Sequence, residues 1–209
     1  MMMESFKIRN EARVLLNNHW GTAVGTVFLM QLIYLGAAWL DDISLILSFI
    51  PVFIISGAIE LGLAAFFINL AEKKDLIFED AFSGFKNFIK ALGVTFFWSL
   101  FFILWSLLLI IPGIIATIRY SQAYFILKDN PTISVLDTLK QSSEMMHGYK
   151  TDYFLLQLSF IGWAILCILS LGIGFLWLTP YIKTSNAIFY RELKKIRIEK
   201  ESGKMIAQV

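Results

Sequence analysis

Four long stretches of this sequence are apolar and almost free of charge, which constrains the fold more than any other feature. They comprise residues 20–40, 43–71, 91–127 and 153–190. The first carries no charged residue, and the other three carry one each, Glu60, Arg119 and Lys183 respectively. A helix needs about 20 apolar residues to cross a bilayer. Since 57% of the chain is hydrophobic and only 16% is charged, we predict an all-α, polytopic transmembrane helical bundle.

The third and fourth stretches are too long for one span each. Both contain turn residues near the middle, Pro112-Gly113 and Gly172-Ile173-Gly174, so each is predicted to form a helical hairpin. The prediction is then six spans in three hairpins, and the alternative is four spans. With six spans and a cytoplasmic N terminus, every Lys and Arg except Arg119 and Lys183 lies in a cytoplasmic segment. Four spans would export residues 119–152, so the positive-inside bias favours six.

Three polar connecting segments have helical patterning. In residues 78–92 aromatic and aliphatic side chains recur every three or four positions, opposite charged ones, as an interfacial amphipathic helix requires. A second such helix is expected to begin at Asn130-Pro131 and stop at Gly148. A third is expected within residues 6–19. Solvated connecting helices without lipid contact are the alternative for all three.

The order of elements suggests an internal repeat. Residues 1–195 are predicted to form a single transmembrane domain, with repeat units 1–72, 73–128 and 129–195. Each unit contains an amphipathic helix, a span, a short external turn and a second span. Residues 196–209 are expected to form a basic cytoplasmic tail, attracted to anionic lipids.

A local pattern supports the repeat. Each second span contains a charged residue, then a small residue two positions later, then Ala two further on. The charged residues are Glu60, Arg119 and Lys183, and the small ones are Gly62, Ala64, Ser121, Ala123, Ser185 and Ala187. Small residues allow close helix packing in lipid, so the second spans are expected to form an inner ring. A chance match in a sequence so rich in Phe and Ala is the alternative.

The three charged residues suggest a site. A charge in hydrocarbon is costly, so Glu60, Arg119 and Lys183 are expected to face the protein interior or water. If they meet at one depth, a net charge of +1 would attract a phosphate or carboxylate group in a cytoplasm-facing cavity. The alternative is structural: Glu60 pairs with one cation, and the other extends towards the headgroups.

Motifs of enzymes and of metal sites are missing from the sequence. It contains no HExxH, Cys-x-x-Cys, GxxxxGK[ST] or GxSxG, so no enzyme activity, cofactor or metal site is predicted. The single cysteine, Cys167, excludes an intramolecular disulfide. The tail lacks the folded basic face with interleaved aromatic residues that nucleic-acid binding would need.

Seven short motifs resemble a known family of bacterial membrane proteins. They are Phe82-Ser83-Gly84-Phe85, 107–113 (LLLIIPG), 120–124 (YSQAY), Asp129-Asn130-Pro131, Met145-Met146-His147-Gly148, 158–163 (LSFIGW) and Phe189-Tyr190-Arg191. Together they are similar to the family called domain of unknown function 975, over nearly the whole chain. This resemblance implies a multi-spanning protein of the plasma membrane. The closing motif and the IPG element also resemble, more distantly, the membrane domain of some glycerophosphodiester phosphodiesterases.

The expected function is therefore non-enzymatic. We expect a bacterial plasma-membrane protein with both termini in the cytoplasm, in contact with membrane lipids, whose core binds or transports an anionic lipid headgroup or a small solute. The alternative is a scaffold or accessory subunit that organises partners at the inner leaflet.

Overall fold

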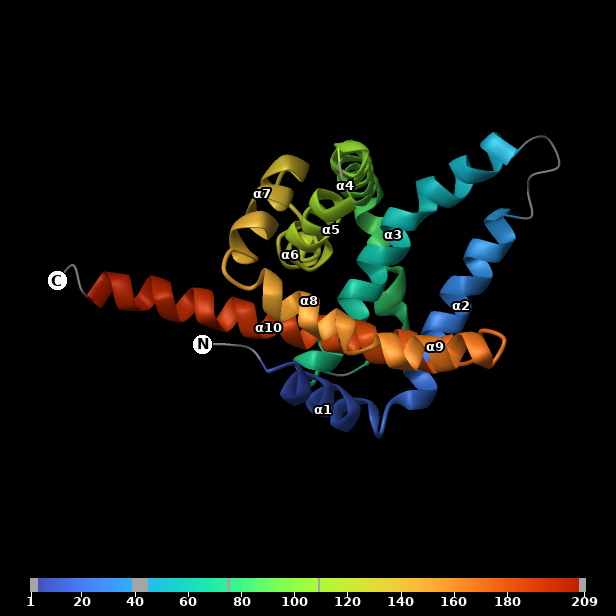
Figure 1. Ribbon diagram of the computed structural model, residues 1–209, viewed down its shortest axis with the longest axis horizontal. Coiled ribbons are helices and arrows are strands. Elements are labelled where there is room, and N and C mark those ends of the chain that lie inside the picture. Colours follow the sequence, from blue (N-terminus) through green and yellow to red (C-terminus); the bar gives the residue numbers. More distant parts are fainter. Residues whose placement is uncertain (1–3, 39–44, 75, 109, 207–209) are drawn as a thin grey trace.

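The computed structural model describes residues 4–38, 45–74, 76–108 and 110–206, and all regular structure in these ranges is helical (Figure 1). In chain order the elements are α1 (Ser5–Leu16), α2 (Trp20–Ala38), α3 (Leu45–Ala71), the 3₁₀ helix η1 (Phe78–Asn87), α4 (Phe88–Leu108), α5 (Ile110–Arg119), α6 (Ala123–Asp129), α7 (Val135–Met145), α8 (Lys150–Leu158), α9 (Ile161–Leu169) and α10 (Phe175–Ile206). The predicted all-α class is confirmed.

In the part of the chain that the structure describes, four helical segments are long and apolar enough to cross a membrane. They are Trp20–Ala37, Ile50–Ala71, Phe78–Leu107 and Lys150–Leu169. By length and composition these segments identify a multi-pass membrane protein.

Both long apolar stretches fold back on themselves. The chain reverses between α9 and α10 at Leu171 and Gly172, which have positive φ angles of 56° and 86°. A left-handed conformation suits glycine, because it has no Cβ, and the turn predicted at Gly172–Gly174 is confirmed. In the other stretch α5 packs back along α4.

The position of the α4–α5 reversal differs from the prediction. Helix α4 ends at Leu108 and α5 begins at Ile110, so Pro112-Gly113 is not the turn: Pro112 lies in the first turn of α5 and Gly113 follows it within the helix. Proline is tolerated there, since the first N–H groups of a helix have no intrahelical partner. Gly113 instead packs against Ser106 of α4, where a Cβ would overlap the serine side chain.

The predicted amphipathic segments are helical with changed boundaries. The segment predicted over residues 78–92 is a 3₁₀ helix as far as Asn87. The α-helix α4 then begins at Phe88, inside the predicted segment. Helix α7 begins at Val135 and not at Asn130-Pro131, because the Ser134 hydroxyl caps it by accepting a hydrogen bond from the Asp137 N–H. Helix α1 covers most of the third segment.

Helix α3 crosses η1 at a glycine contact. A Cβ at Gly62 would overlap the Ala81 carbonyl oxygen, and a Cβ at Gly84 would overlap the Ala58 carbonyl oxygen. The two backbones therefore touch, and Ala58 and Ala81 are fully buried. The other side of η1 leaves Phe78, Phe82 and Phe85 exposed, as contact with lipid requires.

Packing is dense at one end of the bundle and open at the other. We call the dense end the base; it is formed by α1, η1, α6, α7, the second half of α3 and the middle of α10. On α3 every residue from Leu61 to Ala71 except Asn69 is buried, whereas Ile50, Phe53 and Ile54 are exposed. The tips of the hairpins diverge from the base, as α2–α3 and α9–α10 do in Figure 1. Exposed apolar side chains at the tips are suited to lipid contact.

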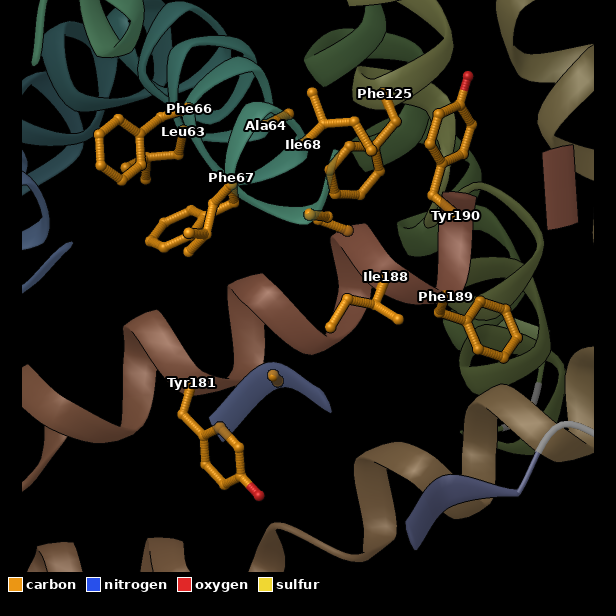
Figure 2. Packing of buried hydrophobic residues seen from close by; sticks show 14 of the residues in the cluster. Leu63, Ala64, Phe66, Phe67, Ile68, Phe125, Tyr181, Ile188, Phe189 and Tyr190 are labelled. Atoms are coloured by element: carbon orange, nitrogen blue, oxygen red, sulfur yellow. The ribbon is translucent and has the colours of Figure 1, made fainter. Parts of the chain in front are cut away.

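The core of the base joins α3 to α10. Phe66, Phe67, Ile188 and Phe189 are fully buried there, and Figure 2 shows the Phe67 ring between the two helices. The ring of Tyr190 stacks on Phe125 of α6, with 5.1 Å between centroids. This packing places the second half of α3 and the middle of α10 in the protein interior.

Hydrogen bonds between distant segments also join the helices at the base. Arg191 on α10 donates to the Ala71 carbonyl oxygen and to Glu11 Oε1 of α1, the latter at 2.7 Å. Asp129 of α6 accepts from the Tyr190 hydroxyl at 2.9 Å and pairs with Lys194 at 2.7 Å. The predicted tail begins within α10, which continues to Ile206.

Glu192 gives the base a dependence on pH. Burial raises the pKa of this carboxyl, but hydrogen bonds from Lys195 and Arg191 outweigh burial and hold its pKa below the ordinary 4.5. Its contribution to stability is therefore complete above pH 4.5 and is lost as the pH falls through the lower, folded pKa. We expect the unfolding midpoint of wild type to fall more than that of Glu192→Gln when the pH drops from neutral into this range. Equal losses in both proteins, with Glu79→Gln as the exposed control, would contradict this assignment.

Candidate functional site

A cavity of about 460 Å³ lies between the three hairpins. Its walls come from α2, α3, α4, α5, α6, α8 and α10, so segments from all three predicted repeat units contribute to it. The volume is within the range of sites for small molecules. The residues nearest the base, such as Phe67 and Phe125, belong to the buried core. Exposed Phe53 lines the cavity on the side of the tips.

An ion pair lies in the cavity wall. Lys183 of α10 donates to Glu60 Oε2 of α3. The two side chains are 26% and 37% exposed, so both remain accessible from the cavity. A pair at this depth needs mutual neutralisation, because either charge alone would be costly in hydrocarbon. The pair has no net charge.

Arg119 is separated from this pair. It is absent from the described lining of the cavity and makes no ion pair with a described residue. Its Nε is buried and finds no hydrogen-bond partner among the described residues. The structure thus brings two of the three predicted charged residues together, and the expected net charge of +1 is not assembled in the cavity.

The reason is a break in the helix directly after Arg119. In α3 and α10 the repeated pattern lies within an uninterrupted helix, but α5 ends at Arg119 and α6 starts at Ala123. Ser142 of α7 stabilises the break: its hydroxyl donates to the Arg119 carbonyl oxygen at 2.9 Å and accepts from the Gln122 N–H at 3.2 Å. The break presents Tyr120 and Ser121 to the cavity instead.

Hydroxyl groups line much of the remaining wall. Tyr34, Tyr124 and Tyr153 line the cavity together with Glu60. The Tyr124 hydroxyl lies 2.8 Å from Thr95 Oγ1, and Tyr153 and Ser121 line the same cavity. Apart from Ser121, none of these residues was predicted from the sequence as part of a site. The sequence pattern that could have indicated them is the presence of single Ser, Thr and Tyr residues inside otherwise apolar stretches.

The small residues of the pattern take different places. Gly62 allows the close crossing with η1, and Ala64 and Ser121 line the cavity. Ala123 and Ala187 are fully buried in two core clusters. Ser185 is also buried, and its hydroxyl donates to the Tyr181 carbonyl oxygen of its own helix.

Comparison with known proteins assigns the chain to a protein family. The model for "Protein of unknown function (DUF975)" matches residues 2–116 and 107–197. The chain belongs to the DUF975 family. All residues that line the cavity lie within the DUF975 match. No curated protein and no solved structure matches the chain, so the distant similarity to the membrane domain of glycerophosphodiester phosphodiesterases stays a prediction.

The side chains that line the cavity of this DUF975 protein can bind a polar ligand. An ammonium group, a carboxylate, phenols, hydroxyls and the Asn186 amide can hold a polar ligand by charge and hydrogen bonds. Among the described residues that line the cavity, Lys183 carries the positive charge. An anionic ligand group can therefore compete with Glu60 for Lys183.

Proposed function

We propose that this chain is a non-enzymatic protein of the bacterial plasma membrane that binds or transports a small anionic solute or an anionic lipid headgroup in its central cavity. In this proposal six spans form three hairpins, both termini are cytoplasmic, and the base lies at the inner leaflet. The observation that carries it is the Glu60–Lys183 pair in the wall of a cavity that several hydroxyl groups also line.

Contacts at the base support the three-hairpin topology. Helix η1 leads directly into the first residues of α4, and Lys90 near this end donates to the Pro131 carbonyl oxygen just before α7. Gly93 contacts Val135 at the start of α7. The connector 119–152 and η1 therefore lie at the same end of the α4–α5 hairpin, as six spans require. With four spans this connector would be on the opposite side of the membrane from η1.

The ligand is recognised through exchange of ion-pair partners. Glu60 neutralises Lys183 in the structure. A phosphate or carboxylate group on the ligand would take the place of Glu60 beside Lys183, and the displaced Glu60 would accept hydrogen bonds from hydroxyl groups of the ligand or of the neighbouring tyrosines. A ligand that carries both an anionic group and hydroxyl groups fits this wall best.

A scaffold or accessory subunit is the second candidate. The exposed Phe78, Phe82 and Phe85 of η1 favour it, because they could contact a partner as well as lipid. An accessory subunit needs no polar central cavity, however, so the cavity with its ion pair favours binding.

Glycerol 3-phosphate and inorganic phosphate are suitable probes. We expect glycerol 3-phosphate to raise the thermal unfolding midpoint of the purified protein, because a ligand that binds only the folded state stabilises it. The shift should vanish in Lys183→Gln and persist in Lys86→Gln, an exposed lysine outside the cavity lining. Inorganic phosphate should give a smaller shift, since it lacks the hydroxyl-bearing part. A shift in Lys183→Gln equal to that of wild type, or no shift with either probe, would contradict the proposal.

A further inference from the structure

A second cavity, separate from the central one, lies between the N-terminal helices and the third hairpin. Its volume is about 510 Å³, and we call it the tryptophan groove. Its lining is Arg13, Trp20, Trp163, Leu166, Cys167, Ser170, Gly174, Trp177, Leu178 and Tyr181. From Tyr181 to Gly174 the groove follows about two turns of α10, or roughly 10 Å. It therefore runs from the base towards the tip of the hairpin.

The walls of the groove are apolar and open to the surroundings of the protein. Trp163 and Trp177 are about half exposed, and Leu166 is 57% exposed. In a membrane protein such side chains contact acyl chains, and tryptophan in particular prefers the boundary between headgroups and hydrocarbon. An apolar groove on this face is thus adjacent to lipid along its length.

Arg13 lies at the base end of the groove. It is exposed on α1, whose opposite face (Ile8, Ala12 and Leu16) is buried in the core. It makes no ion pair or hydrogen bond with any described residue. An unpaired guanidinium beside an apolar groove can bind the phosphate oxygens of a lipid through two parallel hydrogen bonds.

We propose that the tryptophan groove binds one anionic phospholipid of the surrounding bilayer. Arg13 binds the headgroup phosphate at the base, and the three tryptophans cover an acyl chain that extends towards the tip. The charge of Arg13 complements the anionic headgroup, and the apolar wall complements the chain. This site shares no lining residue with the central cavity and so does not depend on the function proposed for that cavity.

Native mass spectrometry of the protein released from nanodiscs tests this site. The nanodiscs contain equal amounts of phosphatidylglycerol and phosphatidylcholine. We expect wild type to retain one phosphatidylglycerol preferentially. Arg13→Ala should reduce this preference about fivefold, because the attraction of one basic side chain to the anionic lipid is lost. Arg13→Lys keeps the charge but not the two parallel hydrogen bonds, so its preference should lie between those of Arg13→Ala and wild type. Lys7→Ala removes the same charge from the same helix, outside the groove, and should leave the preference unchanged.

Trp177→Ala tests the acyl-chain part of the groove. It should reduce retention of both lipids while leaving the preference between them. The proposal is overturned if Arg13→Ala retains phosphatidylglycerol as wild type does, or if millimolar inorganic phosphate displaces the bound anion. It is also overturned if Trp177→Ala converts a dimer to a monomer without loss of lipid, because the groove would then be covered by a second copy of the chain.

Discussion

Gly62→Ala is expected to prevent stable folding, although the substitution adds one methyl group and improves helix propensity. A Cβ at this position would overlap the Ala81 carbonyl oxygen, and two backbones would have to separate to admit it. We expect a loss of at least about 3 kcal/mol, against a gain of about 1 kcal/mol from the intrinsic preference for alanine in a helix. The measurement is the folded fraction after gel filtration, together with the unfolding midpoint in detergent.

Gly25→Ala is the matched control, because it makes the same change in the neighbouring span α2. Nothing lies within 4 Å of a Cβ there, so we expect unchanged or slightly raised stability. Gly84→Ala should behave like Gly62→Ala, since it would overlap the Ala58 carbonyl oxygen at the same crossing. A stable Gly62→Ala protein would mean that η1 does not pack on α3 in this way.

Glu60→Gln and Lys183→Gln are each expected to lower stability by about 2 kcal/mol. Breaking a fully buried ion pair costs about 3–5 kcal/mol, but both side chains face the cavity and are partly exposed, so the expected effect is smaller. The double variant should recover to within about 1 kcal/mol of wild type, because two amides can bond each other without an unpaired charge. Thermal unfolding of all four proteins in the same detergent gives the coupling energy.

Additive losses in the double variant would show that the two residues do not act as a pair. Glu79→Gln provides the control, since Glu79 is exposed on η1 and its neutralisation should change stability by less than about 0.5 kcal/mol. An unchanged midpoint in both single variants would likewise exclude the pair.

Local chemistry determined the features that sequence analysis predicted well. The turn after α9 was predictable because Gly172 adopts a positive φ that few other residues tolerate. The turn after α4 was misplaced because proline fits a turn and the first turn of a helix equally well. The start of α7 was misplaced for a similar reason: Asn130 and Ser134 are both good cap residues, and only Ser134 makes the capping hydrogen bond.

Features that depend on distant contacts could not be predicted in this way. The position of Arg119 depends on the break between α5 and α6, which Ser142 stabilises from a separate helix. Arg191 pairs with Glu11, from the opposite end of the chain. Local sequence patterns contain no information on which distant residue supplies such a partner. The pairing of Glu60 with Lys183 was predictable as one alternative, because unpaired charges are costly in lipid.

In the proposed topology the chain forms three hairpins joined at a base on one side of the membrane. The exposed residue Lys140 on α7 and the exposed Ile173 at the third tip report the two sides. In a Cys167→Ala background, Lys140→Cys and Ile173→Cys are treated with a membrane-impermeant maleimide in intact cells and after lysis. We expect Ile173→Cys to react in intact cells and Lys140→Cys only after lysis. The reverse pattern, with Lys140→Cys labelled from outside, would contradict the three-hairpin fold and the function proposed for its cavity.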